Sequence, residues 1–303
     1  DAILSRGLGD VYKRQLIGSS ILRGSITKKI SKHYFVYEKS HKNIQKIKKI
    51  SNKIRILKIL DNKLSDVDLV VLSTPMSEYE KIIPNLNRYL NKNCLITDVG
   101  STKENILKLK NKRLSKSLDW ITSHPISGSE VSGPEYGTKN LFVNKWCVVV
   151  NDKNKIKQNK LLKFWKKLGS KVTIMDAKTH DKIFSITSHL PHLIAYNLIK
   201  TAQDFQKKQK KGVIKFSAGG LRDFSRIAAS NEIMWRDIFL DNKRNIVSAI
   251  NLFINNLNSF KKNIEKLDDK ILRKKLINSK KVRQQILSLK QDIAKPDFGR
   301  DQE

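Results

Sequence analysis

Cysteine and acidic residues are scarce in this chain, and long apolar runs are absent from it. Cys94 and Cys147 are the two cysteines, and each lies inside a short apolar segment, where a thiol usually packs as a small core residue. This excludes a disulfide framework and a cysteine metal site, and it favours a reducing compartment. No stretch reaches the roughly 18 to 20 apolar residues of a membrane span, and the N-terminus lacks the apolar segment of a secretory signal. We therefore expect a cytoplasmic protein.

The shortage of acidic residues makes the chain strongly basic. Lysine and arginine number 61 against 28 aspartates and glutamates, so the formal net charge is +33. A site for single-stranded nucleic acid typically shows a stripe of basic residues with interleaved aromatics. Here the lysines are instead spread through nearly every polar stretch and form no such stripe. A general compositional drift towards lysine explains this better than nucleic-acid binding does. A positive field also attracts small anionic substrates.

The first half of the chain alternates short β-branched runs with helix-length polar segments. This alternation predicts parallel strands joined by helical crossovers, as in a Rossmann-type, doubly wound, mostly parallel α/β sheet. The runs lie at residues 34–37, 67–73, 94–98, 118–122, 146–150 and 172–175.

The strand pattern ends after Asp176, and a helical pattern replaces it. Apolar residues then recur at spacings of three and four, with few helix breakers. One example is the series Ile246, Ile250, Phe253, Ile254, Leu257 and Phe260. We predict a nucleotide-binding domain over residues 16–177, an all-helical domain over 178–292 and a tail over 293–303. The apolar helix faces can be buried within the helical domain or against a second subunit, and we expect a homodimer.

A dinucleotide-binding sheet should begin with a strand that runs into a glycine-rich turn, where the backbone approaches the pyrophosphate. This chain has only fragments of that signature, because six residues separate the Gly7-Leu8-Gly9 segment from Leu16. Residues 1–6 contain no convincing strand, so we predict that the first strand is missing or corrupted and that residues 1–15 are foreign to the natural chain. The first helix would then open at Leu16.

Several residues are nevertheless expected to contact the cofactor. Glu38 follows the run at 34–37, about 20 positions after Gly18. A carboxylate there accepts hydrogen bonds from ribose hydroxyls and repels the extra phosphate of NADP, which favours NAD. A solvated glutamate at a strand end is the alternative interpretation. The expected cofactor contacts are Ile17, Gly18, Ser19, Glu38, Thr74 and Pro75.

Four later segments occur in a specific order. They are TDVGSTK at 97–103, SHPISGSE at 123–130, HD at 180–181 with SHLPH at 188–192, and GGLRDFSRIA at 219–228 leading to MWRD at 234–237. Together they resemble the prephenate/arogenate dehydrogenase family, and the likeness runs from Leu16 to about residue 290. The resemblance implies NAD-dependent oxidative decarboxylation of prephenate to 4-hydroxyphenylpyruvate and CO2 in tyrosine biosynthesis, with arogenate as the alternative substrate.

The resemblance also implies roles for individual residues. His124, which we expect in a loop after an apolar strand, would accept the proton of the ring hydroxyl. Ser101 would lie near both His124 and the nicotinamide. Arg226 would hold the ring carboxylate, because a guanidinium binds a carboxylate through two hydrogen bonds. His192, Ser129 and Glu130 would line the side-chain end of the substrate, with Arg222 as a supporting charge.

The remaining histidines indicate no metal. His189 and His192 are closely spaced but have no nearby cysteine or suitable carboxylate. His180 and His189 are instead candidates for a structural role at the domain junction, and Trp235 for packing at the edge of the site.

Two other classes of protein remain as alternatives. A hydroxyacid dehydrogenase shares the two-domain plan, but it generally uses a helix-borne lysine as its acid/base, which the His124 and Arg226 segments argue against. A non-catalytic nucleic-acid-binding protein would show a binding affinity that falls steeply with salt.

Overall fold

The computed structural model of the chain describes residues 2–5, 12–127, 133–209, 212–289 and 291. It divides into two compact units, Asp1–Ile246 and Val247–Glu303. Both the sheets and the predicted site residues belong to the first unit.

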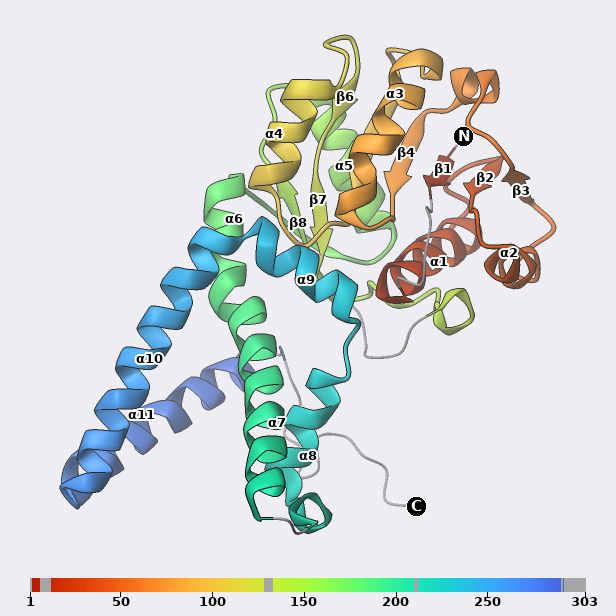
Figure 1. Ribbon diagram of the computed structural model, residues 1–303. Helices are drawn as coiled ribbons and strands as arrows, with labels where there is room; N and C mark the ends of the chain where they lie inside the picture. Colours follow the sequence, from red (N-terminus) through yellow and green to blue (C-terminus); the bar gives the residue numbers. More distant parts are fainter. Residues whose placement is uncertain (1, 6–11, 128–132, 210–211, 290, 292–303) are drawn as a thin grey trace. The chain divides into compact units, whose positions relative to one another are not determined.

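The first unit contains a six-stranded sheet in which all neighbouring strands run parallel (Figure 1). The strands in spatial order are β3 (Ile54–Leu57), β2 (Tyr34–Tyr37), β1 (Ala2–Ser5), β4 (Leu69–Leu72), β5 (Leu95–Asp98) and β6 (Asp119–Trp120). The predicted Rossmann-type α/β fold is confirmed, and β3 is a strand that the sequence pattern did not reveal.

The expectation that the first strand is missing is wrong. β1 occupies the centre of the sheet, where Ile3 pairs with Phe35 of β2 on one side and with Val70 of β4 on the other. The apolar run at residues 2–4 has only three residues, which is too short to predict a strand by itself. Here hydrogen bonds from neighbouring strands on both sides stabilise it, and such long-range pairing leaves no local pattern in the sequence.

A second sheet of three strands follows β6 directly. In it β7 (Ser123–Pro125) pairs antiparallel with β8 (Trp146–Val150), and β8 pairs parallel with β9 (Lys171–Met175). His124 was predicted to lie in a loop, but it sits in β7 opposite Val148. The prediction failed because three residues ending in proline are recognised as a strand only through their pairing with β8.

Two clusters of buried apolar side chains hold the sheets and helices together. One contains Val70 and Ile96 together with side chains of the helices α3 (Tyr79–Tyr89), α4 (Glu104–Arg113) and α9 (Glu232–Asp241). The other contains Val71 and Leu95 together with side chains of α1 (Tyr12–Thr27) and α5 (Lys155–Lys167). The alternation of Val70 and Val71 between clusters reflects the two faces of a strand. The helices that follow the strands are α1, α2 (His41–Lys48), α3, α4 and α5.

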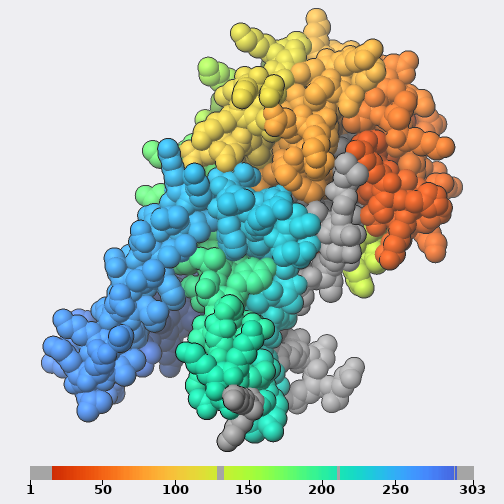
Figure 2. Space-filling view, viewed as in Figure 1, coloured from red at the N-terminus to blue at the C-terminus, as the bar shows by residue number. Residues whose placement is uncertain are grey.

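The predicted change to helices after Asp176 is also confirmed. Asp176 caps the first of them by accepting the N–H of Thr179. These helices are α6 (Ala177–Phe184), a π-helical turn (Ser185–His189), α7 (Leu190–Gln209), α8 (Gly219–Ala228) and α9 (Glu232–Asp241). α8 packs beside α7, and Figure 2 shows α9 in light blue against the orange and yellow segments of α3 and α4.

The second unit contains most of α10 (Lys243–Glu265) and the whole of α11 (Asp269–Ser288). Asp268 caps α11 through the N–H of Ile271, and Lys275 joins the two helices by donating to Ser259 Oγ and Asn263 Oδ1. Within the parts of the chain that the structure describes, no helix has the length and apolar character needed to cross a membrane.

Candidate active site

The carboxyl ends of the parallel strands carry three of the six residues predicted to contact the cofactor, Glu38, Thr74 and Pro75. Glu38 follows β2, Thr74 lies just beyond β4, and Ser101 lies beyond β5. Because these strands are parallel, their carboxyl ends share one edge of the sheet. The strand order reverses between β1 and β4, and at such a point an open α/β sheet forms its ligand crevice.

Glu38 is held firmly at the end of β2. The residue is only 3% exposed, and Oε1 accepts the backbone N–H groups of Lys39 and Ser40, both at 3.0 Å. Ser40 in turn caps α2 by accepting the N–H of Asn43. This carboxylate is therefore built into the strand end and is not a solvated surface group.

The turn after β4 is fully buried. Thr74 Oγ1 donates to the carbonyl of Pro75 at 3.2 Å, and both residues are buried. Neighbouring Ser73 is 2% exposed, and its hydroxyl has no hydrogen-bond partner among the residues that the structure describes. A buried hydroxyl without a partner is costly unless a ligand satisfies it. Together with the Glu38 carboxylate, this hydroxyl fits a bound dinucleotide.

The first helix corrects one expectation. α1 begins at Tyr12, not at Leu16, so Ile17, Gly18 and Ser19 lie beyond its first turn. Backbone N–H groups beyond the first turn are bonded within the helix, and the Ser19 hydroxyl donates to Leu16 O. The glycine-rich segment that precedes α1 lies outside the described residues. Cofactor binding by Ile17, Gly18 and Ser19 therefore stays a prediction.

A buried ion pair organises the turn that contains Ser101. Lys103 and Asp98 are both 0% exposed, and Lys103 Nζ lies 2.6 Å from Asp98 Oδ2. Lys103 Nζ also donates to the carbonyl oxygen of Ser123, at 2.6 Å. Burial lowers the pKa of Lys103, while the neighbouring Asp98 acts in the opposite direction. This lysine thereby ties the end of β5 to the residue that precedes His124.

The other acceptor positions of Asp98 are also occupied. Oδ1 accepts the indole N–H of Trp120 at 3.1 Å, and Oδ2 accepts the N–H of Gly100 at 2.8 Å. A Cβ atom on Gly100 would lie 2.9 Å from Asp98 Oδ2 and 2.8 Å from Ile106 Cδ1. Glycine is therefore needed here for close approach.

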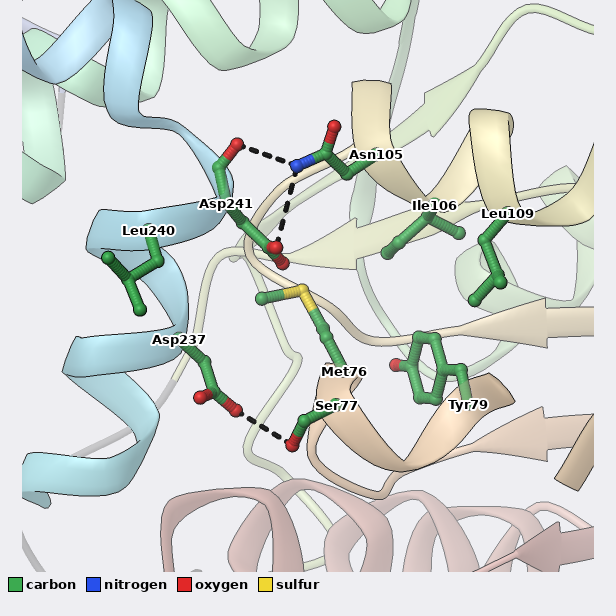
Figure 3. Close-up of a pocket in the computed structure, with 9 residues that line it drawn as sticks. All are labelled: Met76, Ser77, Tyr79, Asn105, Ile106, Leu109, Asp237, Leu240 and Asp241. Atoms are coloured by element: carbon green, nitrogen blue, oxygen red, sulfur yellow. Dashed lines mark hydrogen bonds between the residues drawn. The ribbon is translucent and has the colours of Figure 1, made fainter. Parts of the chain in front are cut away.

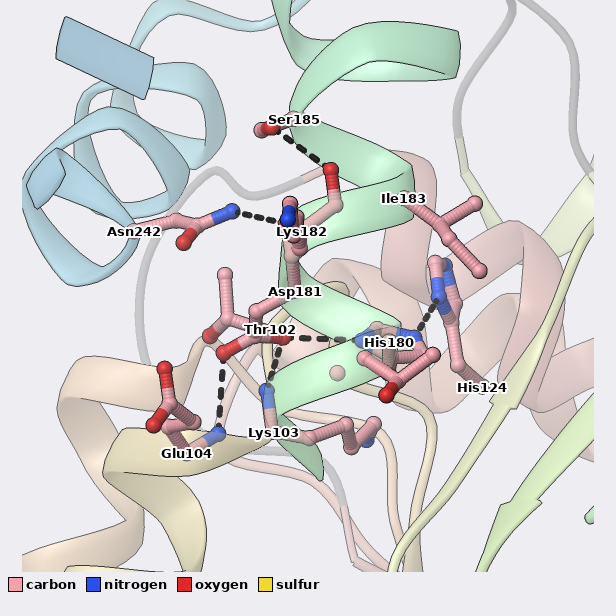
Figure 4. Close-up of polar contacts among 12 residues, drawn as sticks. Thr102, Lys103, Glu104, His124, His180, Asp181, Lys182, Ile183, Ser185 and Asn242 are labelled. Carbon is pink, nitrogen blue, oxygen red and sulfur yellow. Dashed lines mark hydrogen bonds and ion pairs between the residues drawn. The ribbon is translucent and has the colours of Figure 1, made fainter. Parts of the chain in front are cut away.

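The imidazole of His124 is hydrogen-bonded to a second histidine, His180, a contact that the sequence analysis did not predict. Nδ1 of His124 lies 2.9 Å from Nε2 of His180, and Nδ1 of His180 lies 2.8 Å from Oδ1 of Asp181 (Figure 4). The ring of Phe184 packs against both imidazoles, with centroid distances of 4.9 and 4.4 Å. His124 is half-buried, and His180 is completely buried.

Asp181 links this pair to the start of α4. Its Oδ1 accepts the backbone N–H of Lys103 at 2.8 Å, and its Oδ2 accepts that of Glu104 at 2.9 Å. Lys103 is the residue that caps α4 and Glu104 is its first residue, so the carboxylate lies at the N-terminus of the helix, where the helix dipole favours a negative charge. The backbone carbonyl of Asp181 accepts from Asn242 Nδ2, which also lies 3.1 Å from His189 Nδ1.

His192 stacks on Trp235 at the start of α7. The ring centroids are 3.8 Å apart and the rings are inclined by 24°. His192 Nδ1 lies 2.9 Å from the carbonyl oxygen of Ser188, so this nitrogen carries the proton. Trp235 is 3% exposed and belongs to an apolar core cluster, which agrees with the packing role expected for it.

The structure does not draw every predicted residue together. Arg222 and Arg226 lie one turn apart on α8 and are exposed, and Ser101 is half-buried in the turn before α4. Ser129 and Glu130 lie outside the described residues. The substrate-binding roles of these residues stay predictions.

A pocket of about 200 Å³ lies between the turn after β4, the start of α4 and α9 (Figure 3). Two carboxylates face it from α9. Asp237 Oδ2 accepts from Ser77 Oγ, while the backbone carbonyl and Oδ1 of Asp241 both accept from Asn105 Nδ2. Its other walls are mainly apolar, formed by Met76, Tyr79, Ile106, Leu109 and Leu240. None of the residues predicted to bind substrate or cofactor lines it.

Comparison with known proteins identifies the fold and the family. Residues 25–174 match the model of the prephenate dehydrogenase nucleotide-binding domain, and residues 176–278 match that of the prephenate dehydrogenase dimerization domain. A cyclohexadienyl dehydrogenase of Zymomonas mobilis is 30% identical over 286 residues, which cover 91% of this chain and 94% of that protein. The chain belongs to the prephenate dehydrogenase family.

Other members agree with this result. A prephenate dehydrogenase of Lactococcus lactis is 31% identical over 93% of this chain and 76% of its own length. The crystal structure of prephenate dehydrogenase from Aquifex aeolicus, in complex with hydroxyphenyl propionate and NAD+, has a TM-score of 0.85 and 30% identity over 94% of this chain and 98% of that chain. Family membership confirms the predicted oxidoreductase class, and the matches support the predicted cofactor, NAD.

Sequence reasoning missed two features of this family member's site. Lys103 was recognised as part of the 97–103 segment without a role, although a lysine directly after a strand-end Asp-x-Gly-Ser is a signal that could have been used. His180 was treated as a candidate for a structural role, and the adjacent Asp181 was the available sign of a histidine–carboxylate pair.

Proposed function

We propose that this chain catalyses the NAD-dependent oxidative decarboxylation of prephenate to 4-hydroxyphenylpyruvate and CO2, within tyrosine biosynthesis. The observation that carries the proposal is the position of His124. Its imidazole is half-buried and supported by His180, and its strand follows directly on the parallel sheet whose carboxyl edge holds Glu38 and the buried Ser73 hydroxyl. The family match and the relatives named above support the same activity.

Glu38 would hold the adenine ribose of NAD, and Ser101 would lie near the nicotinamide. When bound, NAD+ supplies the hydride acceptor. His124 would accept the proton of the substrate's ring hydroxyl. Once the carboxyl group leaves as CO2, its bonding electrons make the ring aromatic, and the phenolate oxygen can recover the proton from His124. Aromatisation makes the reaction effectively irreversible.

Arg226 and Arg222 would bind the ring carboxylate, and His192 would face the side chain of the substrate together with Ser129 and Glu130. A guanidinium suits a carboxylate because it offers two parallel N–H donors. The net charge of +33 also favours the approach of a substrate with two negative charges.

One observation favours arogenate as a second candidate substrate. Because His192 Nδ1 carries its proton toward the Ser188 carbonyl, Nε2 of the neutral ring accepts hydrogen bonds. An acceptor suits the ammonium group of arogenate, whereas the keto group of prephenate needs a donor and hence a protonated His192. Specificity constants for both substrates, measured across the titration range of histidine, distinguish the two cases.

The activity is tested by following NADH formation with prephenate and with arogenate. In the His124→Ala variant kcat should fall by about 10² to 10⁴ while substrate affinity is nearly kept. The control is His33→Ala, because His33 is exposed and lies before β2. Unchanged turnover in His124→Ala would remove His124 from the chemistry, and no NADH with either substrate would refute the proposed function.

Arg226→Ala should instead mainly raise KM, by about 10- to 100-fold, since a charge-assisted hydrogen bond contributes about 1.5 to 3 kcal/mol. Arg88→Ala is the matched control, because Arg88 is an exposed arginine on α3. If the two variants have the same KM, Arg226 does not bind the substrate.

We also propose that the chain forms a homodimer through its helical domain, residues 178–292. Residues 176–278 match the dimerization domain model of the family. Within the second unit, α10 and α11 expose many apolar side chains, including Leu252, Ile254, Leu257, Leu276, Ile277 and Val282. Light scattering coupled to size-exclusion chromatography tests this, and a monomer at micromolar concentration would contradict it.

A cytoplasmic location stays a prediction, which the two buried free cysteines support.

A further inference from the structure

The hydrogen-bonded chain from His124 through His180 to Asp181 determines where each proton lies. Asp181 accepts two backbone N–H groups at the start of α4, and a carboxylate in this position is charged and only accepts. The nitrogen that faces it, His180 Nδ1, must therefore be a donor. In a neutral imidazole the other nitrogen, Nε2, is then an acceptor.

Several features keep His180 neutral. Burial lowers the pKa of His180, and the nearby Lys103 ammonium lowers it further, whereas the hydrogen bond to Asp181 and the charge of Asp98 raise it. His124 faces it from β7, and Phe184 covers both imidazoles from α6. With burial as the largest effect, the neutral ring predominates at physiological pH.

This arrangement fixes the tautomer of His124. We propose that His180 and Asp181 are positioning residues that hold the His124 proton on Nδ1 and so present an unprotonated Nε2 to the hydroxyl group of the substrate. The inference rests on the proposed function for its catalytic meaning, but the tautomer itself is a property of the free protein.

The direction of these hydrogen bonds, that is, which nitrogen donates and which accepts, decides whether His124 can accept a proton from the substrate. If His180 carried a second proton, its Nε2–H would donate to His124 Nδ1, and neutral His124 would carry its proton on Nε2. In that state His124 could not accept a proton from the substrate. Burial, which keeps His180 neutral, excludes this second proton. The Asp181 carboxylate excludes the other neutral tautomer of His180, with its proton on Nε2, because it requires a donor from His180 Nδ1.

The substitution His180→Phe tests the idea. Phenylalanine keeps an aromatic ring beside Phe184 but removes the acceptor for His124 Nδ1–H. His180→Gln is the conservative variant, because its side-chain carbonyl can accept the same hydrogen bond. We expect His180→Phe to lower kcat by about 10- to 1000-fold with KM changed less than about threefold, and His180→Gln to recover most of that loss. His33→Phe, at an exposed site, serves as the control.

Nitrogen-15 NMR of the full chain with labelled histidine gives a readout that is independent of activity. In the parent protein at neutral pH, His124 should show a protonated Nδ1 and an unprotonated Nε2, with the signal assigned by its loss in His124→Gln. In His180→Phe the Nε2-protonated form should appear, and in His180→Gln the parent pattern should return. Circular dichroism establishes that each variant is folded.

The outcomes separate the two proposals. Inactivity of the parent protein with both substrates would refute the proposed function, while the NMR result would still decide the tautomer. A His124 proton on Nε2 in the parent would overturn the inference, as would unchanged kcat in a folded, active His180→Phe variant. A loss of kcat that His180→Gln does not recover would also overturn it, because the acceptor would then be irrelevant.

Discussion

The buried ion pair between Lys103 and Asp98 offers a direct test of how the site is held in place. The substitution Lys103→Met keeps a long unbranched side chain but removes the ammonium group. Asp98 would keep the N–H groups of Gly100 and Trp120 but lose the cation that lies 2.6 Å from Oδ2. The carbonyl of Ser123 would lose its donor from Lys103 as well.

The size of the effect follows from burial. Both side chains are 0% exposed, so the remaining carboxylate would be an uncompensated charge in a medium of low polarity. Removing one partner of such a pair costs about 3 to 5 kcal/mol of the free energy of unfolding. That is a large share of the roughly 5 to 15 kcal/mol that stabilises a typical protein.

Urea denaturation followed by circular dichroism measures this loss. Lys81→Met is the matched control, because Lys81 pairs with Glu78 at 2.7 Å while its own side chain is 67% exposed, and this change should cost less than about 1 kcal/mol. In the double variant Lys103→Met/Asp98→Asn, stability should recover by about 2 kcal/mol or more relative to Lys103→Met, because no charge remains buried. Equal losses in Lys103→Met and Lys81→Met would refute the reasoning.

Two further predictions concern stability. Burial lowers the pKa of His189 from 6.5 to about 4, so the unfolded chain binds the proton more readily. The contribution of His189, about 3 kcal/mol, is complete above pH 6.5 and is lost as the pH falls towards 4. His189→Gln should flatten this part of the pH–stability curve. Gly137→Ala should cost about 1 to 3 kcal/mol in urea unfolding, because its Cβ would lie 2.1 Å from Ser19 Oγ.

Each of these has a control within the chain. His33→Gln changes an exposed histidine and should leave the pH–stability curve as it is. If His189→Gln does the same, the assigned cause is wrong. Gly220→Ala adds a Cβ with no atom within 4 Å and lies in α8, where alanine is favoured over glycine. A Gly137→Ala variant as stable as Gly220→Ala would contradict the close contact.

The sequence was sufficient for the fold class and the family. Alternating strand and helix patterns predicted the parallel sheet and the change to helices after Asp176, because such periodicity reflects which face of each element is buried. Glu38, which follows β2, and the Asp-x-Gly-Ser segment at 98–101 were recognisable because each stands at the end of a strand whose own apolar run is visible in the sequence.

The tertiary structure decided what depends on contacts between distant residues. β1 is a strand because β2 and β4 pair with it on both sides, and His124 lies in a strand because β8 pairs with it. His124 and His180 are 56 positions apart, and Asp181 meets the start of α4 only after the helical region has packed against the sheet. Local sequence patterns cannot predict such contacts, since the residues involved become neighbours only when the chain folds. Sequence alone therefore determined which residues are available for the chemistry, and folding determined which nitrogen of His124 holds the proton.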